Sequence, residues 1–306
     1  MKIVFMGTPE FAVYSLEALL AEHEVCVVVT QPDKPRGRGK KVTFSPVKEK
    51  AVSAGIPVLQ PSKVKTSKFA NELSSFNADI FVVVAYGRIL PGHILNIPRY
   101  GAINVHASLL PKYRGAAPIQ WAIINGESKT GITIQQMDEG IDTGDIILVE
   151  EIPIAGDDTA SSLHDKLARL GAQALLAAIK LIESGKAQHK PQDENMACYA
   201  PMIDKNTGRI DWNKNSKEIM NLIRGLNPYP AASTFYNGAP LKLYAAEETE
   251  ASGNPGEISI SHSGEIIVKT KDSGICIKEM QKTGGKRMDS ASFQRGNHLV
   301  PGSVLL

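Results

Sequence analysis

The chain has 306 residues, of which 42% are hydrophobic and 22% are charged. This composition is typical of a globular protein and argues against a disordered or fibrous class, and the length predicts more than one domain. The formal net charge is only +2, so a polyanionic partner would have to meet a local basic patch. The three cysteines are widely spaced and form no CxxC or Cys/His cluster, which predicts reduced thiols and no protein-bound metal.

The amino terminus lacks the features of a targeting signal. Residues 1–7, Met-Lys-Ile-Val-Phe-Met-Gly, enter a strand directly, without the charged, apolar and small-residue regions of a signal peptide. No apolar run approaches the roughly 20 residues that are needed to cross a bilayer. We therefore expect a cytoplasmic protein with no membrane contact.

Short apolar runs alternate with helical patterns through the first half of the chain. Residues 11–20 carry apolar side chains at helical spacing, between two runs that read as buried strands. The strands are expected at residues 2–6, 25–29, 56–58, 80–84 and 102–105. This alternation predicts an α/β fold with a Rossmann-like, mostly parallel sheet.

The turn after the first strand bears on cofactor choice. It reads Gly7-Thr8-Pro9, where Thr8 is predicted to cap the next helix and Pro9 to occupy its first position. A dinucleotide fingerprint requires three glycines at this turn, and the sequence has one. The turn therefore argues against nicotinamide or flavin binding.

A basic segment follows the second strand. Residues 31–41 carry five basic side chains against the single acid Asp33, and Pro and Gly predict an irregular loop. Such a run is usually a solvated loop, but it could also be a mobile arm that contacts nucleic-acid phosphates. Because a catalytic site is predicted nearby, we favour the arm.

Polar residues then alternate at the end of a buried strand. Asn104, His106 and Ser108 share one face if the strand geometry continues through them. The carboxyl ends of strands in such sheets bind ligands. An acidic, glycine-rich loop at residues 138–145 supplies three aspartates, Asp138, Asp142 and Asp145, one of which could orient the histidine.

The second half of the chain changes character after a long helix. Strands are predicted near residues 130–137 and 146–152, and the helix begins near Thr159 or Ser161 and ends near Gly185. Later segments are short, alternating and separated by Gly, Asn and Pro, which predicts a small, OB-like β-barrel. We predict a catalytic domain at 1–189, a linker at 190–207 and the barrel domain at 208–306.

These motifs together resemble the methionyl-tRNA formyltransferase family. Residues 104–111, Asn-Val-His-Ala-Ser-Leu-Leu-Pro, look like the signature of folate-dependent formyltransferases, and residues 138–145 are similar to their acidic loop. Four further segments, residues 5–12, 31–35, 224–230 and 285–288, resemble the tRNA-directed branch. The resemblance covers the whole chain.

The resemblance implies an activity, a donor and a partner. The enzyme would transfer a formyl group from 10-formyltetrahydrofolate to the amino group of methionyl initiator tRNA, for translation initiation. It implies a catalytic trio of Asn104, His106 and Asp142. Asp142 is favoured over Asp138 and Asp145 because it lies between two glycines, in the part of the loop that is expected to be more exposed. A two-domain monomer is the simplest expectation for the oligomeric state. The residues implied for the folate site are Ser108, Leu109, Leu110, Pro111, Tyr86, Gly87, Ile89 and Leu90. Those implied for tRNA binding are Arg36, Arg38, Lys40, Lys41, Lys286 and Arg287.

The same sequence features are compared with three rival functions. A folate-dependent formyltransferase acting on glycinamide ribonucleotide or an aminosugar nucleotide is the nearest, but the basic segment and the second domain favour a tRNA acceptor. A non-catalytic RNA-binding protein is disfavoured by the intact trio. A nucleotide-dependent oxidoreductase is disfavoured because the sequence has no glycine-rich dinucleotide fingerprint. Within the site, Ser108 is disfavoured as a nucleophile because the sequence around it is not the G-x-S-x-G elbow.

Overall fold

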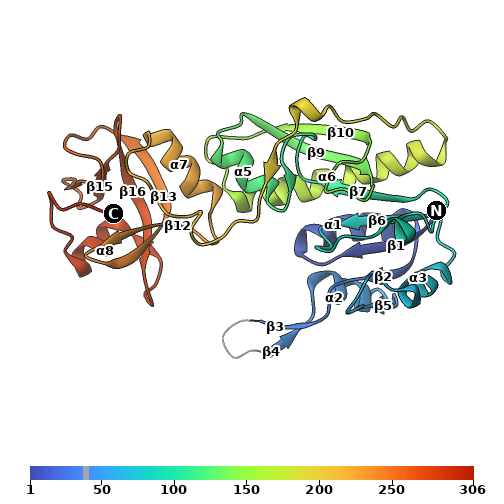
Figure 1. The fold of residues 1–306 in the computed structure, drawn as a ribbon. Helices are drawn as coiled ribbons and strands as arrows, with labels where there is room; N and C mark the ends of the chain where they lie inside the picture. Colours follow the sequence, from blue (N-terminus) through green and yellow to red (C-terminus); the bar gives the residue numbers. More distant parts are fainter. Residues whose placement is uncertain (37–40) are drawn as a thin grey trace. The chain divides into compact units, whose positions relative to one another are not determined.

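The computed structural model describes residues 1–36 and 41–306. The described chain divides into two compact units (Figure 1). The first unit contains Met1–Pro118, Lys129–Ile152 and His164–Ala200, and the second contains Ile119–Ser128, Pro153–Leu163 and Pro201–Leu306. The first part of the predicted linker, residues 190–200, therefore belongs to the first unit.

A mostly parallel sheet forms the first unit. Its order is β10-β9-β7-β6-β1-β2-β5, in which β1, β2, β5, β6 and β7 are parallel and β9 runs antiparallel to β7. The strands are β1 (Lys2–Gly7), β2 (Glu24–Val29), β5 (Val58–Leu59), β6 (Ile80–Val84), β7 (Ala102–His106), β9 (Lys129–Gln136) and β10 (Ile146–Pro153). The helices are α1 (Glu10–Glu22), α2 (Pro46–Ser53), α3 (Ser67–Ser74), α4 (Gly92–Leu95), most of α6 (Ala160–Glu183) and the 3₁₀ helix η1 (Glu194–Met196). Short strands β8 (Arg114–Gly115) and β11 (Tyr199–Ala200) pair separately.

Alternate side chains of the central strands pack under the helices. Val4 and Met6 of β1 share a buried cluster with Phe69 and Leu73 of α3, because side chains two residues apart lie on the same face of a strand. Contacts of α1 and α2 with the sheet run through β1, β2, β5 and β6. Gly7 permits the chain to turn tightly into α1, since a Cβ there would lie 2.8 Å from that of Ala12.

The turn after β1 differs from the prediction. Pro9 is the N-cap of α1, which begins at Glu10, so the helix starts one residue later than expected. Thr8 does not cap the helix; its hydroxyl donates to the carbonyl oxygen of Tyr86 at 3.3 Å. Thr8 therefore joins the loops that follow β1 and β6, at the carboxyl edge of the sheet.

The basic segment is partly regular, contrary to the prediction of an irregular loop. Strands β3 (Lys34–Arg36) and β4 (Lys41–Thr43) form an antiparallel ladder in which Lys34 pairs with Thr43. A proline is compatible with such a two-stranded ribbon, because the ribbon consists of edge strands. At its base, Asp33 accepts from Lys48 Nζ at 2.5 Å and from Gln60 Nε2 at 2.8 Å.

The second unit is an antiparallel barrel with helices. Its sheet order is β12-β13-β16-β15-β14, with β17 paired to β16. The strands are β12 (Ala232–Tyr236), β13 (Ala239–Thr249), β14 (Ile258–Ile260), β15 (Ile266–Lys269), β16 (Gly274–Lys282) and β17 (Met288–Asp289). The helices are α7 (Ser216–Gly225), α8 (Ser290–Asn297) and most of α5 (Pro118–Ile124).

The carboxyl-terminal tail closes this barrel. Ile258 in β14 bonds to the backbone of Gly302 and Ser303, while Phe235 in β12 exchanges two backbone hydrogen bonds with Leu306. The tail therefore bridges the two ends of the sheet and satisfies their edge groups. Trp212 lies in the buried core and donates to Thr234 Oγ1 at 3.0 Å. The predicted fold class, a mostly parallel α/β unit followed by a smaller β-barrel, is confirmed.

No helix among the described residues is both long enough and apolar enough to span a bilayer.

Candidate active site

The predicted polar face lies across two neighbouring strands. Asn104 of β7 pairs in register with Gln135 of β9, and His106 pairs with Thr133. Since Asn104 and His106 are two residues apart in one strand, they share a face, as predicted. The strand ends at His106, so the prediction that Ser108 continues the same geometry is wrong.

Ser108 is part of the loop that leaves the strand. Its side chain is fully buried, and its hydroxyl donates to the carbonyl oxygen of Lys112 at 2.6 Å. Thr133 Oγ1 donates to the carbonyl oxygen of Ser108 at 2.7 Å and accepts from the backbone N–H of Leu110 at 3.1 Å. The bonds of Thr133 hold the loop against β9. The Ser108 hydroxyl donates its proton to the carbonyl oxygen of Lys112 and therefore has no proton left to donate to a ligand.

Both ring nitrogens of His106 face polar atoms. The side chain is buried, with Nε2 at 2.9 Å from the carbonyl oxygen of Tyr113 and Nδ1 at 3.5 Å from Asp142 Oδ1. A carbonyl oxygen can only accept, so this hydrogen bond requires the proton on Nε2. In the neutral ring, Nδ1 is then the nitrogen with the free lone pair, and it faces the carboxylate.

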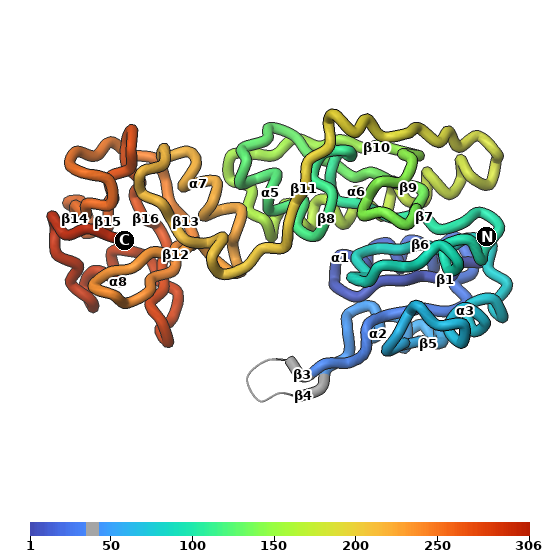
Figure 2. Tube along the Cα trace, viewed as in Figure 1, coloured from blue at the N-terminus to red at the C-terminus, as the bar shows by residue number. Residues whose placement is uncertain are grey.

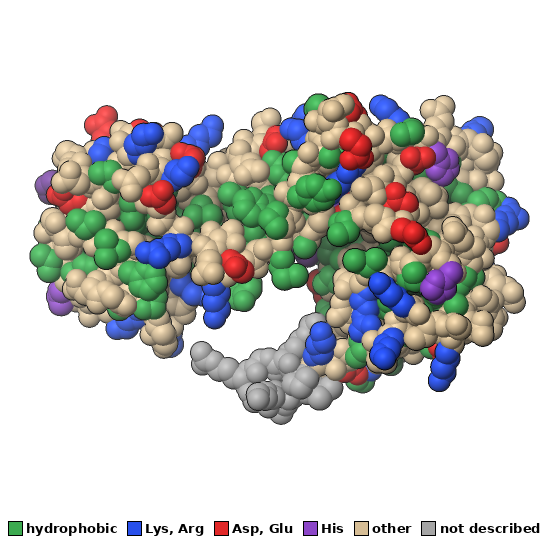
Figure 3. Space-filling model, viewed as in Figure 1, with side chains coloured by type: hydrophobic (Ala, Val, Ile, Leu, Met, Phe, Trp, Pro, Cys, Tyr) green, Lys and Arg blue, Asp and Glu red, His purple; other side chains and the backbone are tan. Residues whose placement is uncertain are grey.

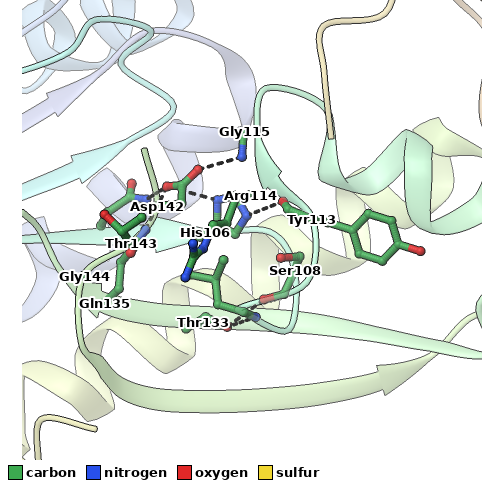
Figure 4. Close-up of polar contacts among 12 residues, drawn as sticks. His106, Ser108, Tyr113, Arg114, Gly115, Thr133, Gln135, Asp142, Thr143 and Gly144 are labelled. Atoms are coloured by element: carbon green, nitrogen blue, oxygen red, sulfur yellow. Dashed lines mark hydrogen bonds and ion pairs between the residues drawn. The ribbon is translucent and has the colours of Figure 1, made fainter. Parts of the chain in front are cut away.

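Asp142 accepts hydrogen bonds from Gln135 and Gly115 and lies beside His106 (Figure 4). Its carboxylate accepts from Gln135 Nε2 at 2.8 Å, from the N–H of Gly115 at 2.9 Å and from Asn104 Nδ2 at 3.4 Å. The backbone of Asp142 is left-handed, with φ +56°, a conformation that Asp and Asn tolerate better than most residues. The four side chains of this cluster, Asn104, His106, Gln135 and Asp142, therefore lie together at the carboxyl end of β7.

The acidic loop contains three candidate carboxylates, Asp138, Asp142 and Asp145, and the half-buried Asp145 accepts from the backbone N–H of Gln136 through its own carbonyl oxygen. Asp138 is exposed and accepts from the N–H of Gly140 and the hydroxyl of Thr143, so it shapes the loop. Asp142 is the one that faces His106, but it is half-buried, so the expectation that it lies in the more exposed part is wrong. The loop packs tightly, since a Cβ on Gly144 would lie 1.7 Å from the carbonyl oxygen of Gln136.

The cluster can supply two kinds of chemistry. An imidazole with a free lone pair beside a carboxylate can accept a proton and be stabilised as a cation. An amide N–H beside it can stabilise an oxygen that becomes negative. In the part of the chain that the structure describes, no group of three His, Cys, Asp or Glu side chains is arranged to hold a metal ion.

The predicted folate residues divide into core and surface. Tyr86, Leu90 and Leu110 are buried, and the first two belong to the core beneath β6. Ile89 is 57% exposed, and Leu109 and Pro111 are half-buried. Gly87 has φ +74°, and its loop follows β6, which is paired with β7. All eight predicted residues thus lie in loops that leave neighbouring parallel strands, β6 and β7.

The predicted tRNA residues lie in the basic segment of the first unit and near β17 of the second. Arg38 and Lys40 lie outside the described residues, and Arg36 and Lys41 contribute only described backbone, in β3 and β4. In the second unit, Lys286 is exposed, while Arg287 pairs with Glu279 and stacks on the ring of Tyr244. Basic and acidic side chains are interspersed on the face drawn in Figure 3. The tRNA assignments stay predictions.

Sequence reasoning missed three partners of the trio. Gln135 sits in a strand that was predicted from its alternation, but only the antiparallel register with β7 places it beside Asn104. The other two are backbone groups, the carbonyl of Tyr113 and the N–H of Gly115. A main-chain hydrogen bond cannot be recognised from the residue type. The one available hint is that position 115 is a glycine, which suits its φ of +114°.

Comparisons with known proteins now bear on this site. Residues 1–179 match the formyl transferase family, and residues 202–298 match the formyl transferase C-terminal domain. Methionyl-tRNA formyltransferase from Caldanaerobacter subterraneus subsp. tengcongensis is 52% identical over 309 aligned residues, covering 100% of both chains. The protein of the same name from Geobacter sulfurreducens is 46% identical, covering 100% of this chain and 96% of its own.

Solved structures show the same fold at lower identity. An N-formyltransferase from Helicobacter canadensis, in complex with folinic acid and dTDP-3-aminofucose, has a TM-score of 0.69 at 24% identity, covering 92% of this chain and 99% of its own. HypX from Aquifex aeolicus, in complex with tetrahydrofolic acid, has a TM-score of 0.66 at 20% identity, covering 96% of this chain and 47% of its own. The full-length matches are decisive: the chain belongs to the methionyl-tRNA formyltransferase family.

Proposed function

We propose that this chain transfers the formyl group of 10-formyltetrahydrofolate to the amino group of methionyl initiator tRNA. The observation that carries the proposal is the cluster of Asn104, His106 and Asp142 at the carboxyl end of β7. Formyl transfer to an amine needs a proton acceptor for the amine and a donor for the carbonyl oxygen that becomes negative. This cluster supplies both, in a chain of this family.

His106 moves the proton. Because Nε2 already donates to the carbonyl of Tyr113, the proton of the attacking amine goes to Nδ1. The cation that results lies 3.5 Å from Asp142 Oδ1, so the carboxylate stabilises it. His106 then returns the proton to the departing folate nitrogen, directly or through water.

Asn104 stabilises the developing oxyanion. Its Nδ2 lies 3.4 Å from Asp142 Oδ1, a long and weak hydrogen bond. The side chain is half-buried, so the amide can exchange this bond for a shorter one to the formyl oxygen. A donor that is already oriented costs little reorganisation during the reaction.

The folate donor fits the loops at the same edge of the sheet. Exposed Ile89 and half-buried Leu109 and Pro111 offer apolar surface beside the trio, while Tyr86 and Leu90 support the loop from the core. Gln31 Nε2 donates to the carbonyl oxygen of Tyr86 at 2.9 Å, which fixes the start of this loop. The residues with exposed surface are therefore the ones we propose to touch the donor.

The decisive experiment compares acceptors. Purified protein with 10-formyltetrahydrofolate is offered charged initiator tRNA, charged elongator tRNA and glycinamide ribonucleotide in separate reactions. Formylation of the initiator methionyl-tRNA is expected, and it should be lost in a folded His106→Ala variant. Formylation of glycinamide ribonucleotide alone would overturn the acceptor, and near-normal turnover in the His106 variant would overturn the assignment of the trio.

The basic segment is proposed to contact tRNA phosphates together with Lys286 and Arg287. Neutralising Arg38, Lys40 and Lys41 should weaken use of tRNA and leave the KM for folate unchanged. Each lost phosphate contact should reduce the slope of log affinity against log salt by about 0.7 to 0.9. Equal losses for both substrates would mean that the segment is structural.

Cytoplasmic location, a monomeric state and a division of labour between a catalytic domain at 1–189 and a tRNA-binding domain at 208–306 remain part of the proposal. Size-exclusion chromatography with light scattering tests the oligomeric state, for which the expected mass is that of one 33.0 kDa chain.

A further inference from the structure

Residues 190–200, which we call the clamp segment, contact the acidic loop directly. Gln192 Nε2 donates to the carbonyl oxygens of Asp142 at 2.9 Å and Gly144 at 2.7 Å. These two carbonyls bracket Thr143, in the turn where Asp142 has its left-handed backbone. The side-chain amide of Gln192 therefore holds together the turn that contains the catalytic carboxylate of Asp142.

Arg114 fixes the orientation of this amide. Its side chain is 1% exposed, and its Nε and Nη2 both donate to Gln192 Oε1, at 3.1 and 2.9 Å. A flipped amide would place its NH₂ against the guanidinium, so the nitrogen of Gln192 must face the loop. Glu194 completes the network by accepting from Nη1 at 2.9 Å and Nη2 at 2.7 Å. The hydrogen bonds from Arg114 lower the pKa of Glu194.

The clamp segment also holds the chain on the other side of His106. Strands β8 and β11 lie side by side and are parallel (Figure 2). The N–H of Arg114 donates to the carbonyl of Cys198 at 2.9 Å, between Tyr113, whose carbonyl accepts from His106, and Gly115, whose N–H donates to Asp142. Both partners of the imidazole are thus held by one segment.

We propose that Gln192 is a positioning residue that keeps Asp142 beside His106, so that the clamp segment belongs to the catalytic apparatus. This inference rests on the proposed function for its kinetic consequence, but its structural consequence can be measured without any substrate. The carboxylate of Asp142 is oriented by Gln135 and Gly115, while Gln192 alone among the described side chains donates to the backbone carbonyls of both Asp142 and Gly144. Loss of Gln192 should therefore loosen the turn and leave the carboxylate free to leave its place.

The test uses two variants with different chemistry. Gln192→Met keeps the length of the side chain and removes every hydrogen bond, whereas Gln192→Glu keeps an acceptor for Arg114 and removes both donors. We expect kcat to fall about 10- to 100-fold in each, because two hydrogen bonds to the loop are lost, with an unchanged KM for folate. Gln173→Met, an exposed position in α6, is the matched control and should keep normal turnover. Full turnover in Gln192→Glu would mean that only the contact with Arg114 matters, and it would overturn the proposal.

Two further measurements separate positioning from general stability. In an Asp142→Asn background the Gln192→Met change should have no further effect on kcat, because both act through one carboxylate; an equal loss in both backgrounds would refute the inference. Amide hydrogen exchange across residues 138–145 should be faster in Gln192→Met and unchanged in Gln173→Met. Unchanged exchange in Gln192→Met would refute the positioning role of Gln192. Because this measurement needs no substrate, the result would hold even if the parent protein formylated a different acceptor.

Discussion

Replacing Asp142 with Asn tests the role of the carboxylate while keeping its shape. Asn also tolerates the left-handed backbone at this position, where φ is +56°, so the substitution adds no strain there. The amide oxygen can take the place of Oδ1, which faces Gln135, Asn104 and His106. Its NH₂ then meets the N–H of Gly115, which loses its acceptor. The substitution removes the charge that would support the imidazolium.

The size of the effect follows from the geometry. A unit charge 3.5 Å from the imidazolium is worth about 5 kcal/mol at an effective dielectric constant of ~20. That energy corresponds to about three and a half decades in rate, within the typical range for general acid–base catalysis. We therefore expect kcat to fall about 3000-fold in Asp142→Asn. The unpaired N–H of Gly115 should also lower the free energy of unfolding by about 1 to 3 kcal/mol.

The assay measures single-turnover formylation of initiator methionyl-tRNA at saturating folate, with urea unfolding in parallel. Asp138→Asn is the matched control, because it makes the same change in an exposed carboxylate of the same loop. It should stay within a few-fold of normal turnover. If Asp142→Asn turned over at more than a tenth of the normal rate, or if Asp138→Asn were equally impaired, the electrostatic reasoning would be wrong.

Three other changes test neighbouring parts of the site. Asn104→Ala should reduce kcat by about 100- to 1000-fold in the formylation assay, since it removes one oxyanion donor, with a circular dichroism spectrum like that of the parent. Gly115→Ala should lower the free energy of urea unfolding by about 1 to 3 kcal/mol, because φ is +114° and the new Cβ would lie 3.0 Å from the carbonyl of Ala200. Glu194 has a folded-state pKa below its ordinary 4.5 because Arg114 donates to it. The stability that this pair contributes is therefore complete above pH about 4.5 and is lost as pH falls through the lowered value. The parent protein should have a higher Tm than Glu194→Gln at neutral pH, and this difference in Tm should shrink as pH falls through that range. A difference that grows as pH falls would contradict the lowered pKa of Glu194.

The sequence predicted the parts of the site that depend on strand periodicity. Alternation in residues 102–106 placed Asn104 and His106 on one face, and the structure confirms this. It failed at Ser108, because the strand ends two residues earlier and the chain turns to bond with Thr133. The end of a strand depends on tertiary hydrogen bonds, which a local pattern does not contain.

The acidic loop shows a different limit. The family resemblance, supported by its position between two glycines, pointed to Asp142. The expected exposure was the wrong reason, since the carboxylate is half-buried and accepts from Gln135 and Gly115. These donors are distant in sequence from one another, and one is a backbone group. The tail was expected among the short segments of the barrel, but not the edges it pairs with, because these depend on which strand edges remain unpaired.

The composition of residues 190–200 explains why their contacts with the site could not be read from sequence. A polar segment without apolar periodicity resembles a linker, because linkers also lack a buried face. Here the polar side chains are used for hydrogen bonds instead: Gln192 bonds to Arg114 and to two backbone carbonyls of the acidic loop. A buried guanidinium requires such partners, since an unpaired buried charge is costly. Arg114 at 1% exposure therefore demands polar residues in the segment that covers it, and the same residues reach the catalytic turn.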